Sequence, residues 1–294
     1  MDRIDELRLF LAVAEHGGFS AGARAVGRSP ASATRAVEGL ERRLGVVLMT
    51  RTTRAVHLTG PGRAYCDRAR VILEDLAQAD ATASGAGTVP AGRLRLTGPV
   101  RFGVLHLVPI LASFLDAFPQ IETDLVFVDR VVNLIDEGFD AALRIGSLPD
   151  SGLVARRVGA VRRVVCAAPA YLERHGVPED PADLPGHRIV AAGQETPTAE
   201  WRFGNAAIRV RPRLSVNAME AAIEAARLGQ GITRVLSYQV ADAVVSGDLR
   251  IVLADHEPAP LPVHLIHAEG RAASAKLRAF LDHATDGLRE RLRN

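Results

Sequence analysis

Arginine forms the clearest chemical pattern in this sequence. Between positions 24 and 54 the chain carries seven arginines and two acidic residues, whereas the whole chain of 294 residues has a formal net charge of only +2. The arginines are Arg24, Arg28, Arg35, Arg42, Arg43, Arg51 and Arg54, and the acids are Glu38 and Glu41. A local surplus of guanidinium groups attracts phosphates, so this segment predicts contact with a polyanion such as DNA.

Motifs for catalysis or metal binding do not appear in the sequence. It contains no HExxH, GxSxG, P-loop or GxGxxG pattern. His264 and His267 stand three residues apart on an expected strand, where their side chains point to opposite faces. Cys66 and Cys166 form no CxxC pair. We therefore expect no enzyme activity, no cofactor and no metal.

Composition and termini point to a cytoplasmic protein. Hydrophobic residues make up 48% and charged residues 24% of the chain, which is ordinary for a soluble globular protein. The N-terminus MDRIDELRLF is charged and has no apolar secretory core, and no continuous apolar run reaches about 18 residues. We expect no membrane partner. The length allows two or more domains with buried cores.

Two short helices are expected to position the arginines. Ser20 is placed to cap a helix over 21–26, and Gly27 then breaks it. Ser29 is placed to cap a second helix, with Pro30 in its first turn. A face made of Ala33, Val37, Leu40 and Leu44 predicts the buried side of this second helix, which follows a first helix with Ile4, Leu7, Leu11 and Ala14 on one face.

The opposite face of the second helix carries the candidate base contacts. Ala31, Thr34, Arg35 and Glu38 point outward, and small residues near the N-terminal end let a helix approach base edges in the major groove. Thr34 and Arg35 are the leading candidates. An ordinary helical hairpin with a solvated face gives the same pattern.

A ribbon is expected after Gly45. The runs VVLMTR and AVHLT are joined by a polar turn from Arg51 to Arg54, which predicts a β-wing lying along the sugar-phosphate backbone. Arg51, Thr52 and Arg54 would position the protein on DNA rather than read bases.

The whole stretch FSAGARAVGRSPASATRAVEGLERRLGVVLMTRTTRAVHLTGPG resembles the winged helix-turn-helix of the LysR-type transcriptional regulators. It departs mildly from the family pattern, with Thr34 where the family usually has Ser and Met49 where it often has Phe. The resemblance implies a DNA reader over residues 1–59, with its helix-turn-helix at about 19–38. The expected DNA contacts are Ser20, Arg28, Ser29, Pro30, Ala31, Thr34, Arg35, Arg51, Thr52 and Arg54.

A long helix is expected after the wing, capped by Thr59 with Pro61 in its first turn. Its apolar residues recur at steps of four and three, as in a coiled-coil seam, at Tyr65, Ala69, Ile72, Leu76, Ala79 and Ala83. Packing on the same subunit is the alternative. The resemblance implies antiparallel pairing into a homodimer, which can pair further into a tetramer, and a palindromic operator. The Gly/Pro-rich segment 84–92 predicts a hinge, so residues 60–92 would be the dimerisation linker.

Strands alternate with helices over 93–294, which predicts an α/β domain. Expected strands cover 93–97, 124–128, 141–146, 164–168, 188–191, 201–203, 208–216, 231–236, 250–254 and 263–268, with helices between them over 131–139 and 218–228 and others around Leu107 to Phe118 and Leu277 to Leu288. The layout resembles the effector domain of the same family, which is related in fold to periplasmic solute receptors. It would form lobe I (93–164 and 268–294) and lobe II (165–267).

A small-molecule inducer is expected at the carboxyl ends of these strands, beside helix N-termini. The candidate residues are Thr97, Gly98, Pro99, Arg101, Asp129, Gly146, Asn217, Met219, Thr233 and Arg234. Thr97 and Asn217 can instead be helix caps, and Arg144 fits a lobe ion pair better than a ligand contact. Arg101 and Arg234 facing one cleft would grip a carboxylate, which predicts a small organic acid. A solute-binding protein serving a transporter is the rival function.

Overall fold

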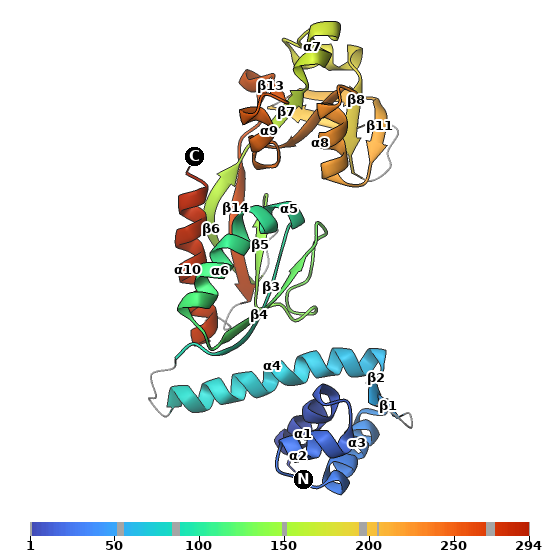
Figure 1. The fold of residues 1–294 in the computed structure, drawn as a ribbon, viewed down its shortest axis with the longest axis vertical. Helices are drawn as coiled ribbons and strands as arrows, with labels where there is room; N and C mark the ends of the chain where they lie inside the picture. Colours follow the sequence, from blue (N-terminus) through green and yellow to red (C-terminus); the bar gives the residue numbers. More distant parts are fainter. Residues whose placement is uncertain are drawn as a thin grey trace.

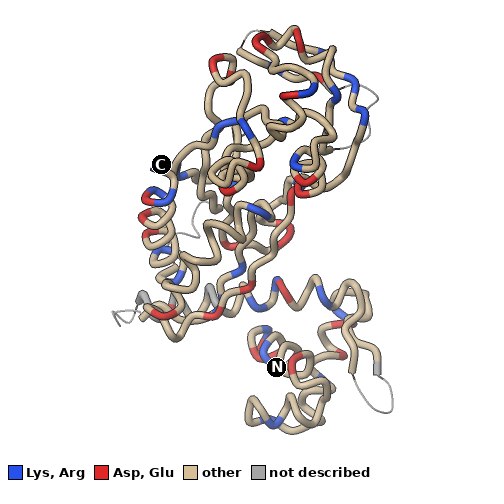
Figure 2. Tube along the Cα trace, turned by 45° about the horizontal axis from the view of Figure 1, so that its top comes forward, with Lys and Arg blue, Asp and Glu red and all other residues tan. Residues whose placement is uncertain are grey.

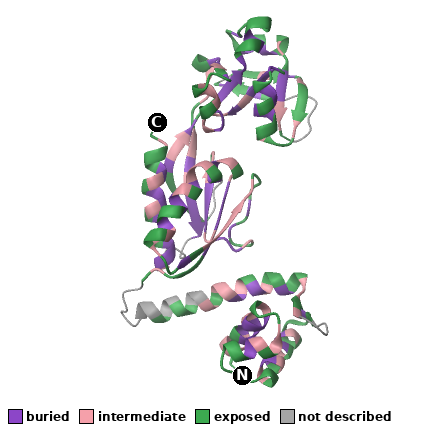
Figure 3. Ribbon diagram, in the orientation of Figure 1, coloured by how far each residue is buried: buried purple, intermediate pink, exposed green. Residues whose placement is uncertain are grey.

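The computed structural model describes residues 2–51, 56–83, 89–148, 152–193, 199–204, 206–268 and 274–293. It has a helical head at the N-terminus, a long helix and a two-lobed α/β domain (Figure 1). Buried residues gather in the head and in each lobe, whereas much of the long helix is exposed or half-buried (Figure 3).

The head contains α1 (Arg3–Glu15), α2 (Phe19–Ala25) and α3 (Pro30–Leu44). Capping of α3 is confirmed, because the Ser29 hydroxyl accepts a hydrogen bond of 3.2 Å from the Ser32 N–H and Pro30 occupies the first turn. Capping of α2 by Ser20 is wrong. That helix begins at Phe19, whose ring packs against the head core, so Gly18 is the N-cap and exposed Ser20 lies within the first turn.

Burial in the head differs in detail from the expected faces. Leu44 at the end of α3 is 38% exposed, and Ala36 is buried beside the expected residues. In α1 the most deeply buried side chains are Leu9, Phe10 and Val13, because α2, α3 and α4 enclose the helix over a broad arc. Of the expected α1 face, Leu7 is buried, while Ile4, Leu11 and Ala14 are half-buried at its flank.

The wing is a two-stranded antiparallel ribbon of β1 (Met49–Arg51) and β2 (Val56–Leu58), in which Thr50 faces His57. The Glu41 carboxylate fixes its start on α3 by accepting hydrogen bonds from the backbone N–H groups of Leu48 (2.7 Å) and Met49 (3.0 Å). The tip of the wing, with Thr52 and Arg54, lies outside the described residues.

The long helix α4 (Gly60–Ala83) starts as expected, since the Thr59 hydroxyl accepts a hydrogen bond of 3.0 Å from the Gly62 N–H. Its first half packs on the head through buried Cys66 and through Tyr65, whose ring lies edge-on to Phe10. Further along, Ile72 is 50% and Leu76 is 36% exposed, so this part of the expected seam has no partner within the described chain. The expected hinge falls mainly on residues 84–88, outside the described residues.

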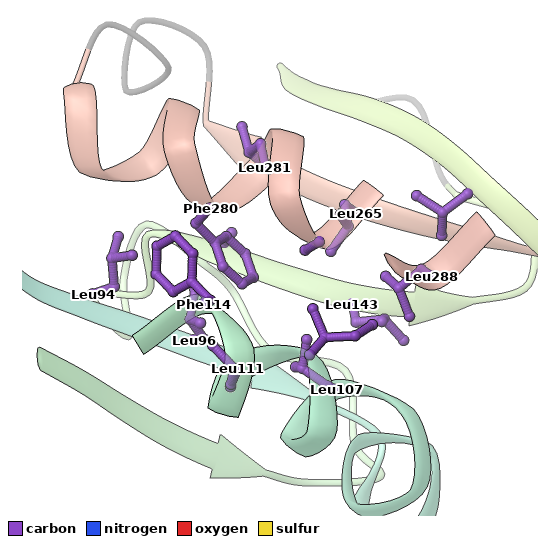
Figure 4. Close-up of a cluster of buried hydrophobic side chains, with 14 of the residues drawn as sticks. Leu94, Leu96, Leu107, Leu111, Phe114, Leu143, Leu265, Phe280, Leu281 and Leu288 are labelled. Carbon is purple, nitrogen blue, oxygen red and sulfur yellow. The ribbon is translucent and has the colours of Figure 1, made fainter. Parts of the chain in front are cut away.

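Lobe I is a five-stranded sheet of order β4-β3-β5-β14-β6. Its strands are β3 (Gly92–Gly98), β4 (Ile121–Phe127), β5 (Ala141–Ile145), β6 (Leu153–Val161) and β14 (Leu261–Ala268). On one face, α5 (Val100–Phe102), the π-helical turn η1 (Gly103–Leu107), α6 (Val108–Ala117) and α10 (Ala275–Arg291) cover the sheet. Figure 4 shows Phe114 of α6 and Phe280 of α10 meeting in this core.

The segment Val100–Ala117 is long and apolar enough, by length and composition, to span a membrane. Phe102, Leu107 and Phe114 from this segment are nonetheless buried in the lobe I core. We therefore interpret it as a core helix.

The expected helix over 131–139 is wrong, because the structure has only a hydrogen-bonded turn there. The Asn133 side chain accepts hydrogen bonds from the N–H groups of Ile135 (3.1 Å) and Asp136 (3.3 Å), which competes with helical bonding. Gly138, with φ +74°, then reverses the chain.

Lobe II is a second five-stranded sheet, of order β11-β8-β12-β7-β13. Its strands are β7 (Arg163–Ala167), β8 (Ile189–Ala192), β11 (Pro212–Val216), β12 (Ile232–Leu236) and β13 (Arg250–Val252). Three helices lie around it: α7 (Pro169–His175), α8 (Met219–Arg227) and α9 (Ala241–Val245). Three 3-10 turns accompany them: η2 (Pro181–Gly186), η3 (Ser237–Gln239) and η4 (Ala254–His256). A separate hairpin consists of β9 (Ala199–Phe203) and β10 (Ala206–Val210). The single strand expected over 208–216 is therefore two strands, which break at Arg211 before Pro212.

The chain crosses between the lobes twice. The first crossing is at Arg162, between β6 and β7, close to the expected position. The second is earlier than expected, because β14 pairs with β5 and β6 of lobe I from Leu261 onward. The boundary expected at 267/268 is therefore wrong, and β6 was not anticipated from the sequence.

Candidate nucleic-acid interface and effector cleft

The outward face of α3 is available to a ligand. Ala31, Arg35 and Glu38 are exposed and Thr34 is half-buried, while the opposite face holds the head core. The guanidinium groups of Arg35 and of exposed Arg42, seven residues further along α3, make no hydrogen bond or ion pair with another described residue. The helix therefore presents two unengaged guanidinium groups about two turns apart on one side.

Other arginines of the head are tied to neighbouring groups. Arg28 Nη2 lies 3.4 Å from an Asp5 carboxylate oxygen, and Arg43 Nη2 lies 3.2 Å from one of Glu6. These surface pairs contribute little stability and can exchange for phosphate contacts. Acidic and basic residues are interspersed in the head and along α4 (Figure 2). The Arg51 backbone belongs to β1, but its side chain, like Thr52 and Arg54, is outside what the structure describes.

On the lobe I side of the cleft, Thr97 is the last residue but one of β3 and is fully buried, and its hydroxyl oxygen has no hydrogen-bond partner among the described residues. Gly98 follows at close approach to Leu143, and Pro99 is the N-cap of α5. Asp129 occupies the end of this helix, because its carboxylate accepts a hydrogen bond of 3.1 Å from the Val100 N–H. This N-terminus is thus already engaged by a protein carboxylate.

Further along the same edge of lobe I, Gly146 turns the chain with φ +109°, and its N–H donates to the Pro262 carbonyl (2.8 Å). Arg144 donates from Nη1 to the Arg130 carbonyl (3.3 Å), and its other terminal nitrogen is buried without a partner among the described residues. Burial lowers the pKa of the Arg144 guanidinium. The expected ion pair of Arg144 is not found among the described residues.

On the lobe II side, Thr233 in β12 is fully buried, and its hydroxyl also has no partner among the described residues. Asn217 is exposed before α8, whose N-cap is Ala218, so the capping alternative for Asn217 is wrong. Met219 opens α8 and is half-buried. Capping by Thr97 is likewise not observed.

The structure separates Arg101 from Arg234. Arg234 lies over the rings of Trp201 and Phe203, in the core on one face of the lobe II sheet. Arg101 instead lines a cavity of about 390 Å³ with Ile223, which belongs to the core on the opposite face. The prediction that both guanidinium groups face one cleft is therefore wrong.

The Arg101 cavity also has the wrong charge for a carboxylate. Glu220, Glu224, Asp242 and Asp248 line it, against the guanidinium groups of Arg101 and Arg227. Arg227 already pairs with Asp248 (2.7 Å) and Glu224 (3.0 Å). The remaining charges are one guanidinium and two carboxylates, so an added anion would meet net repulsion.

Sequence reasoning missed two groups beside the cleft. The Tyr238 ring packs edge-on against Phe102 (5.0 Å between centroids), which joins the lobe II turn η3 to lobe I. Burial raises the pKa of the Tyr238 hydroxyl. Arg163 starts β7 directly after the first crossing. Strand periodicity alone does not indicate that Tyr238 or Arg163 lies there, since their positions depend on which strands become neighbours.

The two buried threonines yield a stability prediction. Thr97→Val and Thr233→Val should each raise the free energy of unfolding by about 1 kcal/mol, because each removes a buried hydroxyl that has no partner among the described residues. Thr285→Val is the matched control, since the buried Thr285 hydroxyl donates to the Leu281 carbonyl (2.5 Å) and its loss should destabilise. Differential scanning calorimetry measures all three. Destabilisation by Thr97→Val would mean that its hydroxyl is satisfied in the native protein.

A helix-turn-helix head with a wing, followed by a two-lobed α/β domain, defines a class of ligand-responsive DNA-binding regulators. Residues 4–63 match the family described as bacterial regulatory helix-turn-helix protein, lysR family, and residues 87–289 match the LysR substrate binding domain. The chain therefore belongs to the LysR-type transcriptional regulators. Members of this family bind operator DNA and small-molecule effectors and form oligomers.

Curated relatives and solved structures agree with this assignment. The uncharacterized HTH-type transcriptional regulator YhjC of Escherichia coli is 33% identical, covering 99% of this chain and 100% of its own. The HTH-type transcriptional regulator DmlR of Escherichia coli is 34% identical, covering 95% and 92%. The structure of CrgA, a LysR-type transcriptional regulator from Neisseria meningitidis, is similar with a TM-score of 0.61 at 31% identity, covering 97% of this chain and 98% of that one.

Proposed function

We propose that this regulator reads a palindromic operator through the outward face of α3 and senses a small organic acid in its effector cleft. Residues 1–59 would bind DNA, 60–92 would pair subunits, and 93–294 would bind the effector. The protein would act in the cytoplasm as a homodimer or tetramer, without catalysis. The solute-receptor alternative gains no support from the relatives, which are transcriptional regulators.

The observation that carries the DNA-binding part is the exposed Arg35 guanidinium near the start of α3, which makes no hydrogen bond or ion pair with another described residue. Thr34 and Arg35 would contact base edges, with Ala31 allowing close approach. Ser20, Arg28, Ser29 and Pro30 would lie along the phosphates near the helix start, and Arg51, Thr52 and Arg54 of the wing would follow the backbone.

The effector part draws support from Thr97 and Thr233, one in each lobe, whose buried hydroxyl groups have no partner among the described residues. Thr97 and Thr233 would hydrogen-bond the effector, with Gly98, Pro99, Asp129, Gly146, Asn217 and Met219 lining its surroundings. Ligand binding would favour one arrangement of the lobes and so change the spacing of the paired heads. Such coupling typically amounts to about 1–3 kcal/mol.

A footprint upstream of the regulator's own gene, repeated with a panel of organic acids, amines and sugars, tests this function. We expect the protein to protect a region with twofold symmetry. One organic acid should change either the length of the protected region or the protein concentration needed to protect it. Protection without symmetry would contradict the paired-head model. An unchanged footprint across amines, sugars and acids would contradict ligand control.

A further inference from the structure

The register of two neighbouring strands brings together Arg163 and Arg234. In the antiparallel pair of β7 and β12, Arg163 faces Leu236 and Arg234 faces Val165. The two arginines are therefore diagonal neighbours on the same face of the lobe II sheet, within reach of one another's long side chains.

The Arg234 guanidinium is fixed by the β9–β10 hairpin. Its Nη2 donates to the Arg202 carbonyl (2.5 Å), and its central carbon lies 5.2 Å from the centroid of the Phe203 ring. Trp201 and Phe203 are themselves buried. The Arg234 Nε is buried and has no hydrogen-bond partner, so one donor of this preorganised group is unused within the described chain.

Neither arginine has an acidic partner among the described residues. Burial lowers the pKa of Arg163, and burial together with the charge of Arg163 lowers the pKa of Arg234 to about 10. Two neighbouring guanidinium groups without an anion repel one another, and their desolvation is uncompensated. A bound anion would relieve both effects.

The arginine pair lies beside the crossing between the lobes. Arg162 precedes Arg163, its carbonyl accepts a hydrogen bond of 2.8 Å from the Ser237 N–H, and its side chain binds Glu257 at 3.0 Å. Glu257 is thus engaged by Arg162. Leu236, opposite Arg163, packs against the lobe I core, so a ligand held by this pair would lie close to the junction.

We propose that Arg163 and Arg234 form an anion anchor on the face of the lobe II sheet opposite Thr233, beside the effector cleft, and hold the carboxylate of a small organic acid. The anchor rests on the proposed effector function of this domain and replaces Arg101 with Arg163 in the pair of carboxylate-binding arginines. Planar guanidinium forks suit bidentate contact with a carboxylate, and the aromatic rings hold one fork in place.

Titration of the full-length protein with sodium malonate, against sodium chloride at equal ionic strength, tests the anchor. Malonate should raise the melting temperature of the unmodified protein, because a ligand that binds only the native state stabilises it. Arg163→Gln and Arg234→Gln should each weaken malonate binding by about tenfold or more, as expected for a charge-assisted hydrogen bond. Arg209→Gln, at an exposed arginine of β10, is the matched control and should leave binding unchanged.

Arg234→Met guards against a variant that simply unfolds. This substitution should lose malonate binding yet melt no lower than the unmodified protein without ligand, because it removes a desolvated charge. Wild-type binding in Arg163→Gln, or no stabilisation of the unmodified protein by malonate, would overturn the anchor. Tighter binding of inorganic phosphate than of malonate would overturn the carboxylate assignment.

Failure of the anchor and failure of the proposed function are distinguishable. Each variant is also measured without ligand for binding to the operator duplex, where we expect unmodified affinity. Anion binding without any operator recognition would leave the anchor standing and contradict the regulator mechanism. Operator recognition without any effect of malonate would leave the regulator mechanism standing and contradict the anchor.

Discussion

Arg35→Glu should lower operator affinity by about a hundredfold or more while leaving the fold unchanged. One good base contact is worth about 1–3 kcal/mol, and a carboxylate at this position would add repulsion from nearby phosphates. The Arg35 side chain is exposed and makes no hydrogen bond or ion pair with another described residue, so its replacement should alter the folding free energy by less than about 0.5 kcal/mol.

Fluorescence anisotropy with labelled operator duplex measures this effect, and light scattering checks that the variant remains oligomeric. Arg209→Glu changes the net charge equally but lies on β10 in lobe II, so it controls for general electrostatics. If Arg35→Glu bound the operator as tightly as Arg209→Glu, base contact by α3 would be ruled out.

Gly22→Ala should destabilise the head by about 3 kcal/mol. A Cβ atom at this position would lie 2.5 Å from the Val13 nitrogen and 2.6 Å from the Ala12 carbonyl carbon. Both atoms belong to the α1 backbone and cannot rotate away, so α1 and α2 would have to separate. The affinity for DNA should fall together with the stability of the head, because α3 packs on both α1 and α2.

Gly39→Ala is the matched control, with the opposite sign. It lies within α3, where the nearest atom to an added Cβ is a Glu6 carboxylate oxygen at an ordinary 3.6 Å. Alanine in a helix interior is favoured over glycine by about 0.5–1 kcal/mol. Hydrogen exchange of the α1 to α3 amides in the full-length protein should therefore quicken in Gly22→Ala and slow in Gly39→Ala. Unchanged protection in Gly22→Ala would refute the close packing of α1 on α2.

Local signals predicted the elements that depend on nearby residues. Ser29 and Pro30 start α3, and Gly45 ends it with φ +69°, because capping requires only adjacent backbone groups. Signals failed where a competing interaction decides the outcome. Phe19 is drawn into the head core and moves the start of α2, and the Asn133 side chain captures amides that a helix over 131–139 would need.

The effector cleft was only partly predictable. The carboxyl ends of β3 and β12 could be located, but the period of two in a strand already places Thr233 and Arg234 on opposite faces of β12. Arg163 becomes a neighbour of Arg234 only through the pairing of β7 with β12, which joins residues about seventy positions apart in the sequence. Long-range register of this kind cannot be read from local patterns.

The most direct measurement of the central claim is binding of the full-length protein to the palindromic operator and to a scrambled duplex across a range of salt concentrations. Sequence readout by α3 predicts a steep decline of affinity with salt for both duplexes, and a preference for the operator of about a thousandfold or more at physiological salt. Equal affinity for the two duplexes would contradict it.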